Sequence, residues 1–270
     1  MARPPSSPRS FRREIADHLP ARLQRHLRYR DLIGHISNIA IRTGPGPGPA
    51  LVLAPHSDDE IIGAGGVAAL HAQAGHPVIA AVATDGHLGT PEGMGPEELV
   101  PLREAESLEA ARHIGFDGVE FGRLTDRSAA SLDHGAAWLS LLMEQLRPHV
   151  VYLPSPVDFH PDHTFVNLIL IQALGRSRWR PTEIAGYEVW TPLIPNLVVD
   201  ITPVAHLKAR ALASFHTQTS RSNIAGASDG LGRRRAGVHL PSASTHGEAF
   251  HTSTPAEFIS LCQKLDPEIS

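Results

Sequence analysis

Two short segments of the chain, PHSDDE at 55–60 and HPDH at 160–163, concentrate histidine and aspartate side chains. Imidazole and carboxylate are common zinc ligands, and a catalytic zinc site uses three protein ligands and one water. Two histidines and one aspartate would leave that fourth position open. The metal would then lower the pKa of the bound water towards neutrality and polarise a carbonyl.

The first segment contains two adjacent aspartates, Asp58 and Asp59. Neighbouring side chains point in different directions, so one can bind the metal while the other takes a proton from the water. Each segment also has a plain structural interpretation. Acidic residues stabilise a helix N-terminus through its dipole, and HPDH is compatible with a turn at helix entry. The conjunction of the two segments favours the catalytic interpretation.

Both segments follow apolar runs that predict buried strands, ALVLAP at 50–55 and VVYLP at 150–154. In an open parallel sheet, ligands bind outside the carboxyl ends of the strands. We therefore expect the two segments to reach the same edge of one sheet, although they lie far apart in the sequence.

The rest of the chain alternates between apolar and helical segments. This pattern predicts an α/β fold of the Rossmann-like type, with a mostly parallel sheet, helices on both faces and an irregular C-terminal portion. We expect further strands at 77–84, 118–121, 183–190 and 196–201. We expect helices at 59–74, 101–113, 132–147, 163–175 and 203–215, and one that begins near 255. The polar segment 219–247 is expected to be a surface loop, and Trp190 to be buried in the core.

The sequence predicts two regions of different character. Residues 1–49 are an N-terminal extension that ends in GPGPGP, and 50–270 form a single domain. Ile15, Leu19, Leu23 and Leu27 recur at helical spacing between arginines, which predicts an amphipathic helix in the extension.

Composition excludes several classes of protein. Of 270 residues, 41% are hydrophobic and 19% charged, with a net charge of −4, which argues against a nucleic-acid partner. No segment approaches the ~20 apolar residues of a membrane span, and the N-terminus lacks the apolar core of a secretory signal. Cys262 is the single cysteine, so a cysteine-based zinc site is excluded. We expect a cytoplasmic protein, and the sequence leaves room for a homo-oligomer.

A dinucleotide-binding motif is a competing interpretation. GAGGVA at 63–68 matches G-x-G-x-x-A, and Asp85 follows about twenty residues later, as that motif requires. However, the first glycine of such a motif follows its strand immediately, whereas here HSDDEII intervenes. We therefore expect these glycines inside a helix, where they allow close packing on the sheet.

The two histidine-aspartate segments resemble the motifs of the LmbE/PIG-L family of zinc-dependent N-acetylglucosaminyl deacetylases. HSDDE is similar to the family's HPDDE, with Ser57 where proline is usual, and HPDH matches the second motif. Weaker similarities are TDG at 84–86, the R-x-x-E pattern that starts at Arg103, and YEVW at 187–190. The resemblance spans roughly residues 50–200. It implies that His56, Asp59 and His163 bind Zn²⁺.

The resemblance also implies roles for the remaining site residues. Asp58 would be the general base. His160 would stabilise the oxyanion or protonate the leaving amine, with Asp162 tuning it. Asp85 and Arg103 stand where relatives contact sugar hydroxyls.

One departure from the family concerns Asp158, which stands where some relatives have tyrosine. A tyrosine-assisted step is therefore not expected.

The implied reaction removes the N-acetyl group from an N-acetylglucosamine-type amino sugar, carried by a small molecule or a glycopeptide. The arginine-rich composition and the elaborated C-terminal portion favour a glycopeptide antibiotic intermediate of the teicoplanin or A40926 type. The alternatives are a mycothiol- or bacillithiol-type thiol precursor, and a non-catalytic sugar-binding protein that keeps the fold.

Overall fold

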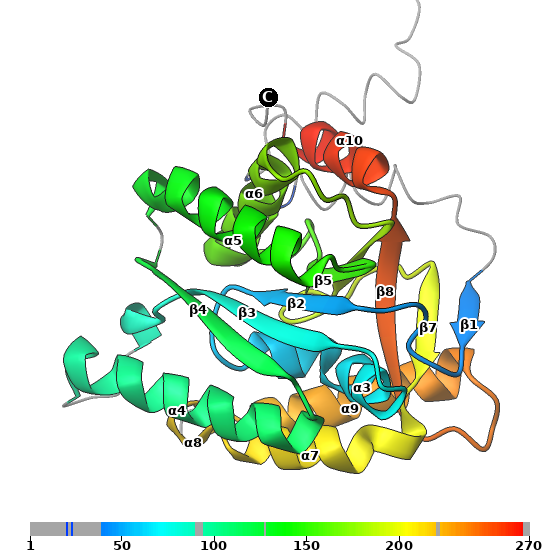
Figure 1. Ribbon diagram of the computed structural model, residues 1–270. Coiled ribbons are helices and arrows are strands. Elements are labelled where there is room, and N and C mark those ends of the chain that lie inside the picture. The colour runs from blue at the N-terminus through cyan, green and yellow to red at the C-terminus, as the bar shows by residue number, and fades with distance from the viewer. Residues whose placement is uncertain are drawn as a thin grey trace, which may run out of the picture.

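The computed structural model describes Pro20, Leu23 and residues 39–89, 94–126, 128–219 and 222–266. In this part of the chain a central sheet lies between two layers of helices (Figure 1). The strand order is β1-β7-β8-β6-β5-β2-β3-β4. The strands are β1 (Ala40–Arg42), β2 (Ala50–Ala54), β3 (Val78–Thr84), β4 (Gly118–Leu124), β5 (Val150–Pro154), β6 (Glu183–Tyr187), β7 (Leu197–Asp200) and β8 (Gly247–Ser253).

Helices cover both faces of the sheet, as Figure 1 shows. One face carries α3 (Asp59–Gln73), α4 (Pro96–Ile114), α7 (Ala205–Ala213), α8 (His216–Thr219) and α9 (Ile224–His239). The other face carries α5 (Leu132–Leu146), α6 (Pro161–Arg176) and α10 (Pro255–Leu265). No helix in the described ranges is long and apolar enough to cross a membrane.

The sheet is mostly parallel, which confirms the predicted fold class. Parallel pairing joins β2 to both β3 and β5, β3 to β4, β5 to β6, and β1 to β7. Only β8, among the described strands, runs antiparallel, between β6 and β7. The chain builds the sheet outward from β2 in one direction and from β5 in the other. The boundary between these two strands is the topological switch point, where open α/β sheets bind ligands.

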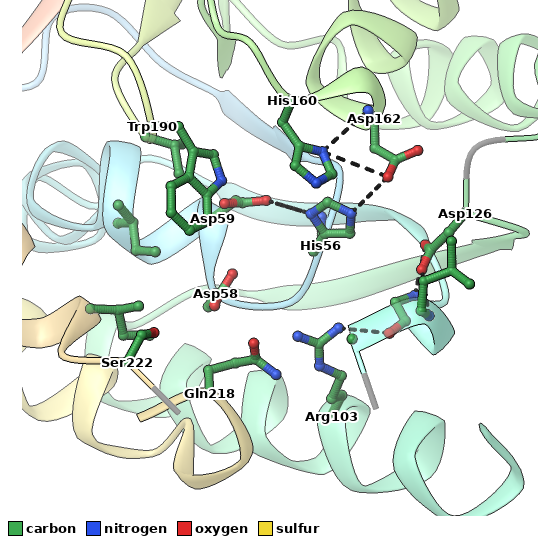
Figure 2. A pocket seen from close by; sticks show the side chains of 16 residues that line it. His56, Asp58, Asp59, Arg103, Asp126, His160, Asp162, Trp190, Gln218 and Ser222 are labelled. Atoms are coloured by element: carbon green, nitrogen blue, oxygen red, sulfur yellow. Dashed lines mark hydrogen bonds and ion pairs between the residues drawn. The ribbon is translucent and has the colours of Figure 1, made fainter. Parts of the chain in front are cut away.

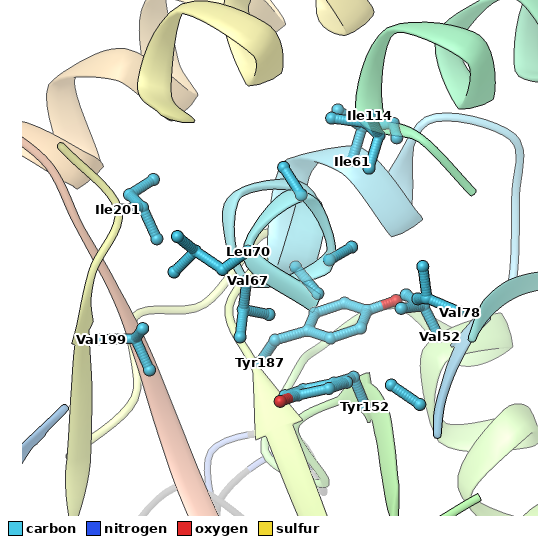
Figure 3. Close-up of a cluster of buried hydrophobic side chains, with 14 of the residues drawn as sticks. Val52, Ile61, Val67, Leu70, Val78, Ile114, Tyr152, Tyr187, Val199 and Ile201 are labelled. Atoms are coloured by element: carbon cyan, nitrogen blue, oxygen red, sulfur yellow. The ribbon is translucent and has the colours of Figure 1, made fainter. Parts of the chain in front are cut away.

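The centre of the sheet is apolar on both faces, as expected for strands buried under helices. All five residues of β2 are buried, and so are all five of β5. One cluster of side chains packs under α3, where the rings of Tyr152 and Tyr187 meet Val67 (Figure 3). The Tyr187 hydroxyl donates to the backbone oxygen of Leu53 at 3.0 Å, which satisfies its buried polar atom.

The glycines of GAGGVA lie inside α3, as predicted, and bring this helix close to its neighbours. A Cβ on Gly63 would lie 2.0 Å from Cδ2 of Tyr187, and one on Gly66 would lie 2.6 Å from Cδ1 of Ile201. The absence of side chains here allows the close approach of helix and sheet.

Three expectations about local structure are wrong. Segment 219–247 is mostly the helix α9, because Asn223 caps its first turn and Arg235 on its inner face is buried. The helix expected from 101 begins at Pro96, with Pro101 inside it. Trp190 is 66% exposed, because β6 ends at Tyr187 and the chain then turns outward.

The N-terminal region enters the sheet before residue 50. Residues 40–42 form β1, which pairs in parallel with β7. Gly/Pro-rich residues then connect β1 to β2. Of the predicted amphipathic helix, Ile15, Leu19 and Leu27 lie outside the described residues, and Leu23 is exposed.

Candidate active site

The two predicted segments meet at the switch point. Segment 55–60 connects β2 to α3, and 155–160 connects β5 to α6. Because β2 and β5 are hydrogen-bonded neighbours, both turns leave the same edge of the sheet. Pro161 occupies the first turn of α6, and His160 caps this helix by accepting the Asp162 N–H through its side chain at 3.3 Å.

One carboxylate oxygen lies between two histidines. Oδ2 of Asp59 is 3.1 Å from Nδ1 of His56 and 3.3 Å from Nε2 of His163. Ligand atoms about 2.0 to 2.1 Å from a tetrahedral zinc ion are separated from one another by about 3.3 Å. The Asp59 oxygen is therefore spaced from each of the two nitrogens as one zinc ligand is spaced from another.

Each of these histidines has a second carboxylate behind it. Nε2 of His56 is 3.2 Å from Oδ2 of Asp162 (Figure 2), and Nδ1 of His163 is 3.4 Å from Oδ1 of Asp158. In metal sites a carboxylate commonly accepts the second ring N–H of a ligating histidine, which fixes its tautomer and orientation. The arrangement therefore leaves Nδ1 of His56 and Nε2 of His163 to face Asp59.

His160 belongs to the same cluster. His56, His160 and His163 each offer one nitrogen, and these atoms lie within 4.8 Å of one another. Burial and the charges of the other two histidines lower the pKa of His160. It is therefore neutral at pH 7, and since its Nδ1 accepts the Asp162 N–H, its proton sits on Nε2.

The predicted pairing of Asp162 with His160 is only partly seen. Oδ2 of Asp162 is 3.6 Å from Nδ1 of His160, farther than from His56. The Asp162 carboxylate therefore interacts more closely with His56 than with His160.

The charges of this cluster are strongly coupled. Burial lowers the pKa of His56, but hydrogen bonds to Asp162 and Asp59 outweigh it and raise the pKa to about 10. Burial likewise lowers the pKa of His163, yet the nearby carboxylates of Asp59 and Asp158 raise it to about 9. Burial alone would raise the pKa of Asp59, but the two histidines hold it low. Without a metal, protons on the two histidines therefore balance the charge of Asp59, and a divalent cation bound there would have to displace them.

Asp58 is held in an unusual backbone conformation beside this cluster. Its φ is 116°, in the region that L-residues rarely adopt, and its side chain is buried. Its N–H donates to Oε2 of Glu60 at 2.9 Å, and Oε1 of Glu60 accepts the Ser107 hydroxyl at 3.2 Å. Burial and the charge of Asp59 raise the pKa of Asp58 well above its ordinary value. A carboxyl group of this kind can accept and hold a proton at neutral pH.

The cluster opens into a cavity of about 230 Å³. Asp58, Asp59 and His160 line its inner end, and Arg103 and Gln218 face them (Figure 2). Drug-sized pockets measure roughly 300 to 1,000 Å³, so this cavity suits a group the size of one sugar ring.

Of the two predicted sugar contacts, one lines the cavity and the other does not. Arg103 is buried in the wall, and its Nη1 donates to the Gly86 oxygen at 2.9 Å. Asp85 lies behind the wall, where its Oδ1 is 2.7 Å from Nδ1 of His87. Asp126 lines the cavity instead, and its carboxylate accepts the N–H groups of Gly86 and Leu88, each at 3.0 Å.

Asp126 is absent from the sequence prediction. It follows the carboxyl end of β4, just as Asp58 and His160 follow β2 and β5. The strand was expected to end at residue 121, so the position of Asp126 at the sheet edge was not apparent.

Trp190 stands exposed at the cavity wall. Its loop is held by Asp158, whose Oδ2 accepts the Trp190 N–H at 2.9 Å and the Thr191 N–H at 3.2 Å. Asp158 therefore links the histidine cluster to the mouth of the cavity.

Comparison with known proteins assigns the chain to a family. Residues 51–174 match the family model described as PIG-L: GlcNAc-PI de-N-acetylase. A probable N-acetyl-alpha-D-glucosaminyl L-malate deacetylase 2 from Bacillus subtilis is 31% identical over 186 residues, which cover 63% of this chain and 82% of that protein. The chain belongs to the PIG-L family. This confirms the resemblance found in the sequence and identifies the protein as a deacetylase.

Solved structures of two enzymes described as deacetylases have the same fold. An N,N'-diacetylchitobiose deacetylase from Pyrococcus horikoshii has a TM-score of 0.67 at 20% identity and covers 96% of this chain and 97% of that one. A zinc-inhibited form of a teicoplanin deacetylase has a TM-score of 0.60 at 17% identity, with 76% and 98% coverage. At this level of identity the likeness concerns the fold.

Proposed function

We propose that the protein is a zinc-dependent hydrolase that removes the N-acetyl group from an N-acetylglucosamine-type amino sugar. The observation that carries the proposal is the position of Asp59 Oδ2, 3.1 Å from His56 and 3.3 Å from His163, with a carboxylate behind each histidine. The relatives described as deacetylases of N-acetylglucosaminyl compounds support the substrate class.

The donor set fits a zinc ion. His163 is fully buried, and neither of its ring nitrogens has a hydrogen-bond partner of good geometry among the described residues, although carboxylate oxygens lie 3.3 and 3.4 Å away. A buried imidazole in this condition is suited to metal ligation. His56, Asp59 and His163 supply two nitrogens and one oxygen, which leaves a fourth position for water or substrate.

The residues of the cavity divide the hydrolysis between them. When bound, zinc supplies a Lewis acid that polarises the acetyl carbonyl and acidifies the attacking water. The ionised carboxylate of Asp58 takes the proton of that water, and burial favours the neutral carboxylic acid that forms. The Nε2–H of His160 donates a hydrogen bond to the carbonyl oxygen and stabilises the negative charge that develops there. The proton on Asp58 then passes to the leaving nitrogen, so acetate and a free amine result.

Arg103 and Asp126 are placed to hold the sugar ring. Arg103 offers fixed N–H donors across the cavity from His160, and Asp126 offers carboxylate acceptors close to His56. A ring with several hydroxyl groups can use both, and it would present its acetamido group to Asp58 and His160. Asp85 acts indirectly in this scheme, because it orients His87 beside Asp126.

For the rest of the substrate we propose a bulky glycoside, such as a glycopeptide antibiotic intermediate. The cavity accommodates about one ring, so any larger acceptor lies outside it. Trp190 and Leu88, which are 66% and 51% exposed at the wall, offer an apolar surface there. The second candidate is a small thiol-precursor sugar, favoured by the Bacillus relative described as a probable N-acetyl-alpha-D-glucosaminyl L-malate deacetylase.

Metal-loaded protein should be incubated with N-acetylglucosaminyl malate, a simple aryl N-acetylglucosaminide and an N-acetylglucosaminyl glycopeptide, with acetate release followed by mass spectrometry. We expect turnover that chelation abolishes and zinc restores. Faster turnover of the glycopeptide supports the bulky acceptor, and faster turnover of the malate compound supports the thiol precursor. Absence of both metal binding and turnover, with sugar binding retained, would favour a non-catalytic sugar-binding protein.

A further inference from the structure

One face of α4 carries three buried polar side chains, and each of them contacts a different segment of the chain next to the cavity. Arg103, Glu106 and Ser107 follow one another at helical spacing and are 5%, 6% and 1% exposed. Arg103 contacts the turn at Gly86, and Ser107 contacts Glu60 beside the strained Asp58. In the R-x-x-E pattern of the sequence, Arg103 therefore contacts the turn at Gly86, whereas Glu106 has a different partner.

Glu106 holds α8 by two hydrogen bonds. Its Oε1 accepts the Thr217 N–H at 2.9 Å, and its Oε2 accepts the Thr217 hydroxyl at 2.6 Å. α8 is a single turn of four residues, too short to be stable by itself, so an anchor of this kind fixes its position. The residue after the anchor is Gln218, which enters the cavity wall.

The Gln218 amide faces the cavity near Asp58 and Arg103 (Figure 2). Among the described residues its one hydrogen bond is a long one, from Nε2 to the Thr217 hydroxyl at 3.4 Å. A carboxamide has two N–H donors and an accepting oxygen, so most of its capacity is directed to a ligand. Asp58 and Arg103 near it are ionisable, whereas the amide is neutral and both donates and accepts.

We propose that Gln218 binds a hydroxyl group of the amino-sugar ring and so helps to determine substrate specificity, and that Glu106 is the positioning residue that places it through Thr217. A hydroxyl matches the amide because it also donates and accepts, while an anionic group would prefer Arg103. Residues 216–219 lie outside the segment 51–174 that matches the family, so this contact belongs to the part of the chain that can distinguish it from relatives. The inference rests on the proposed deacetylase function.

The first test compares the protein with Gln218→Leu on an N-acetylglucosaminide and its 3-, 4- and 6-deoxy analogues. We expect Gln218→Leu to raise KM about tenfold, the worth of one neutral hydrogen bond, with little change in kcat. With the unaltered protein, one of the three deoxy analogues should show a KM about tenfold higher than that of the parent N-acetylglucosaminide. With Gln218→Leu, the KM for the same analogue should not rise further. An equal penalty for all three analogues in both proteins would overturn the inference.

The second test separates positioning from stability. Glu106→Ala should lower kcat/KM about tenfold in the otherwise unaltered protein. In the Gln218→Leu variant the same change should lower kcat/KM less than twofold, because the two substitutions remove the same contact. Glu106→Gln should restore part of the loss, since it keeps an acceptor for Thr217. Glu109→Gln, an exposed position on the same helix, is the matched control and should change nothing.

An equal loss from Glu106→Ala in both backgrounds would mean a merely structural role and would overturn the assignment. Failure of the unaltered protein to deacetylate any N-acetylglucosaminide would overturn the proposed function together with this inference. Normal turnover that is indifferent to Gln218→Leu would overturn this inference alone.

Discussion

Oδ1 of Asp158 lies 3.4 Å from Nδ1 of His163, and both side chains are fully buried. The same carboxylate holds the loop of Trp190 through its other oxygen. Asp158 therefore supports the proposed metal ligand His163 and links it to the wall of the cavity.

Asp158→Asn should weaken zinc binding by about 10- to 100-fold, the range observed when a carboxylate behind a ligating histidine is removed. Competition with a chromogenic chelator measures the affinity. Asp133→Asn, at an exposed position on α5, serves as the control. Unchanged zinc affinity in Asp158→Asn would show that His163 does not need this carboxylate.

Asp58→Asn should retain zinc but lose turnover by about 10²- to 10⁴-fold, because the amide cannot take a proton from water. Asparagine tolerates positive φ better than alanine does, so this variant tests the carboxylate with less disturbance of the backbone at φ 116°. Metal content by mass spectrometry and kcat on an N-acetylglucosaminide are the measurements. Turnover close to normal would exclude Asp58 as the base.

The buried ion pair between Glu188 and Arg235 joins the cavity loop to α9. Nε of Arg235 donates to Glu188 at 3.1 Å, and its Nη2 donates to the Leu193 oxygen at 2.9 Å. Arg235→Met should lower the free energy of unfolding by about 3 to 5 kcal/mol, since it leaves a buried carboxylate unpaired. Urea unfolding measures this loss, and Arg233→Met at an exposed neighbour should show almost none.

The double variant Glu188→Leu/Arg235→Met should recover most of that stability, because an apolar pair carries no desolvation cost. If Arg235→Met unfolds at the same urea concentration as the unaltered protein, the ion pair between Glu188 and Arg235 does not stabilise the fold.

Gly63→Ala should destabilise the fold by at least ~1 to 3 kcal/mol, because its Cβ would lie 2.0 Å from the Tyr187 ring. Gly237→Ala is the matched control in another helix, since a Cβ there meets no atom within 4 Å. It should stabilise α9 by up to ~1 kcal/mol. Thermal unfolding of both variants measures the contrast, and a stable Gly63→Ala would refute the close packing of α3.

His71 should make stability depend on pH at a site remote from the cavity. It is fully buried against the Tyr152 hydroxyl at 3.1 Å, and burial lowers its pKa to about 3. The unfolded chain binds a proton below pH 6.5 that the folded protein excludes. This contribution is present above pH 6.5 and is lost as the pH falls from 6.5 to 3, with a slope up to ~1.4 kcal/mol per pH unit.

The variant His71→Gln should flatten that slope in urea unfolding measured between pH 4 and 7. His134→Gln, at an exposed position on α5, should leave it unchanged. Equal slopes in all three proteins would contradict the assignment to His71.

The sequence was sufficient to predict the fold class and the meeting of the two histidine-aspartate segments, because strand periodicity and position at strand ends are local properties. It was insufficient where burial depends on distant partners. α9 was mistaken for a loop because its buried Arg235 is satisfied by Glu188, which lies 47 residues earlier. The sequence predicts a buried Trp190 because its ring is apolar, but the exposure of this residue depends on the turn after Tyr187, which the residue type does not indicate. Gln218 and Asp126 were missed because neither belongs to a motif.

The cavity draws its two sides from different stretches of the chain. Asp58, Asp59 and His160 come from the strand ends within 51–174, whereas Trp190 and Gln218 come from the C-terminal third of the chain. Part of the wall proposed to receive the acceptor is therefore encoded outside the segment that supplies the proposed hydrolytic groups. Libraries confined to residues 188–193 and 216–224 should yield altered acceptor preferences without loss of the hydrolytic step, which makes this protein a practical starting point for evolving deacetylases toward new glycosides.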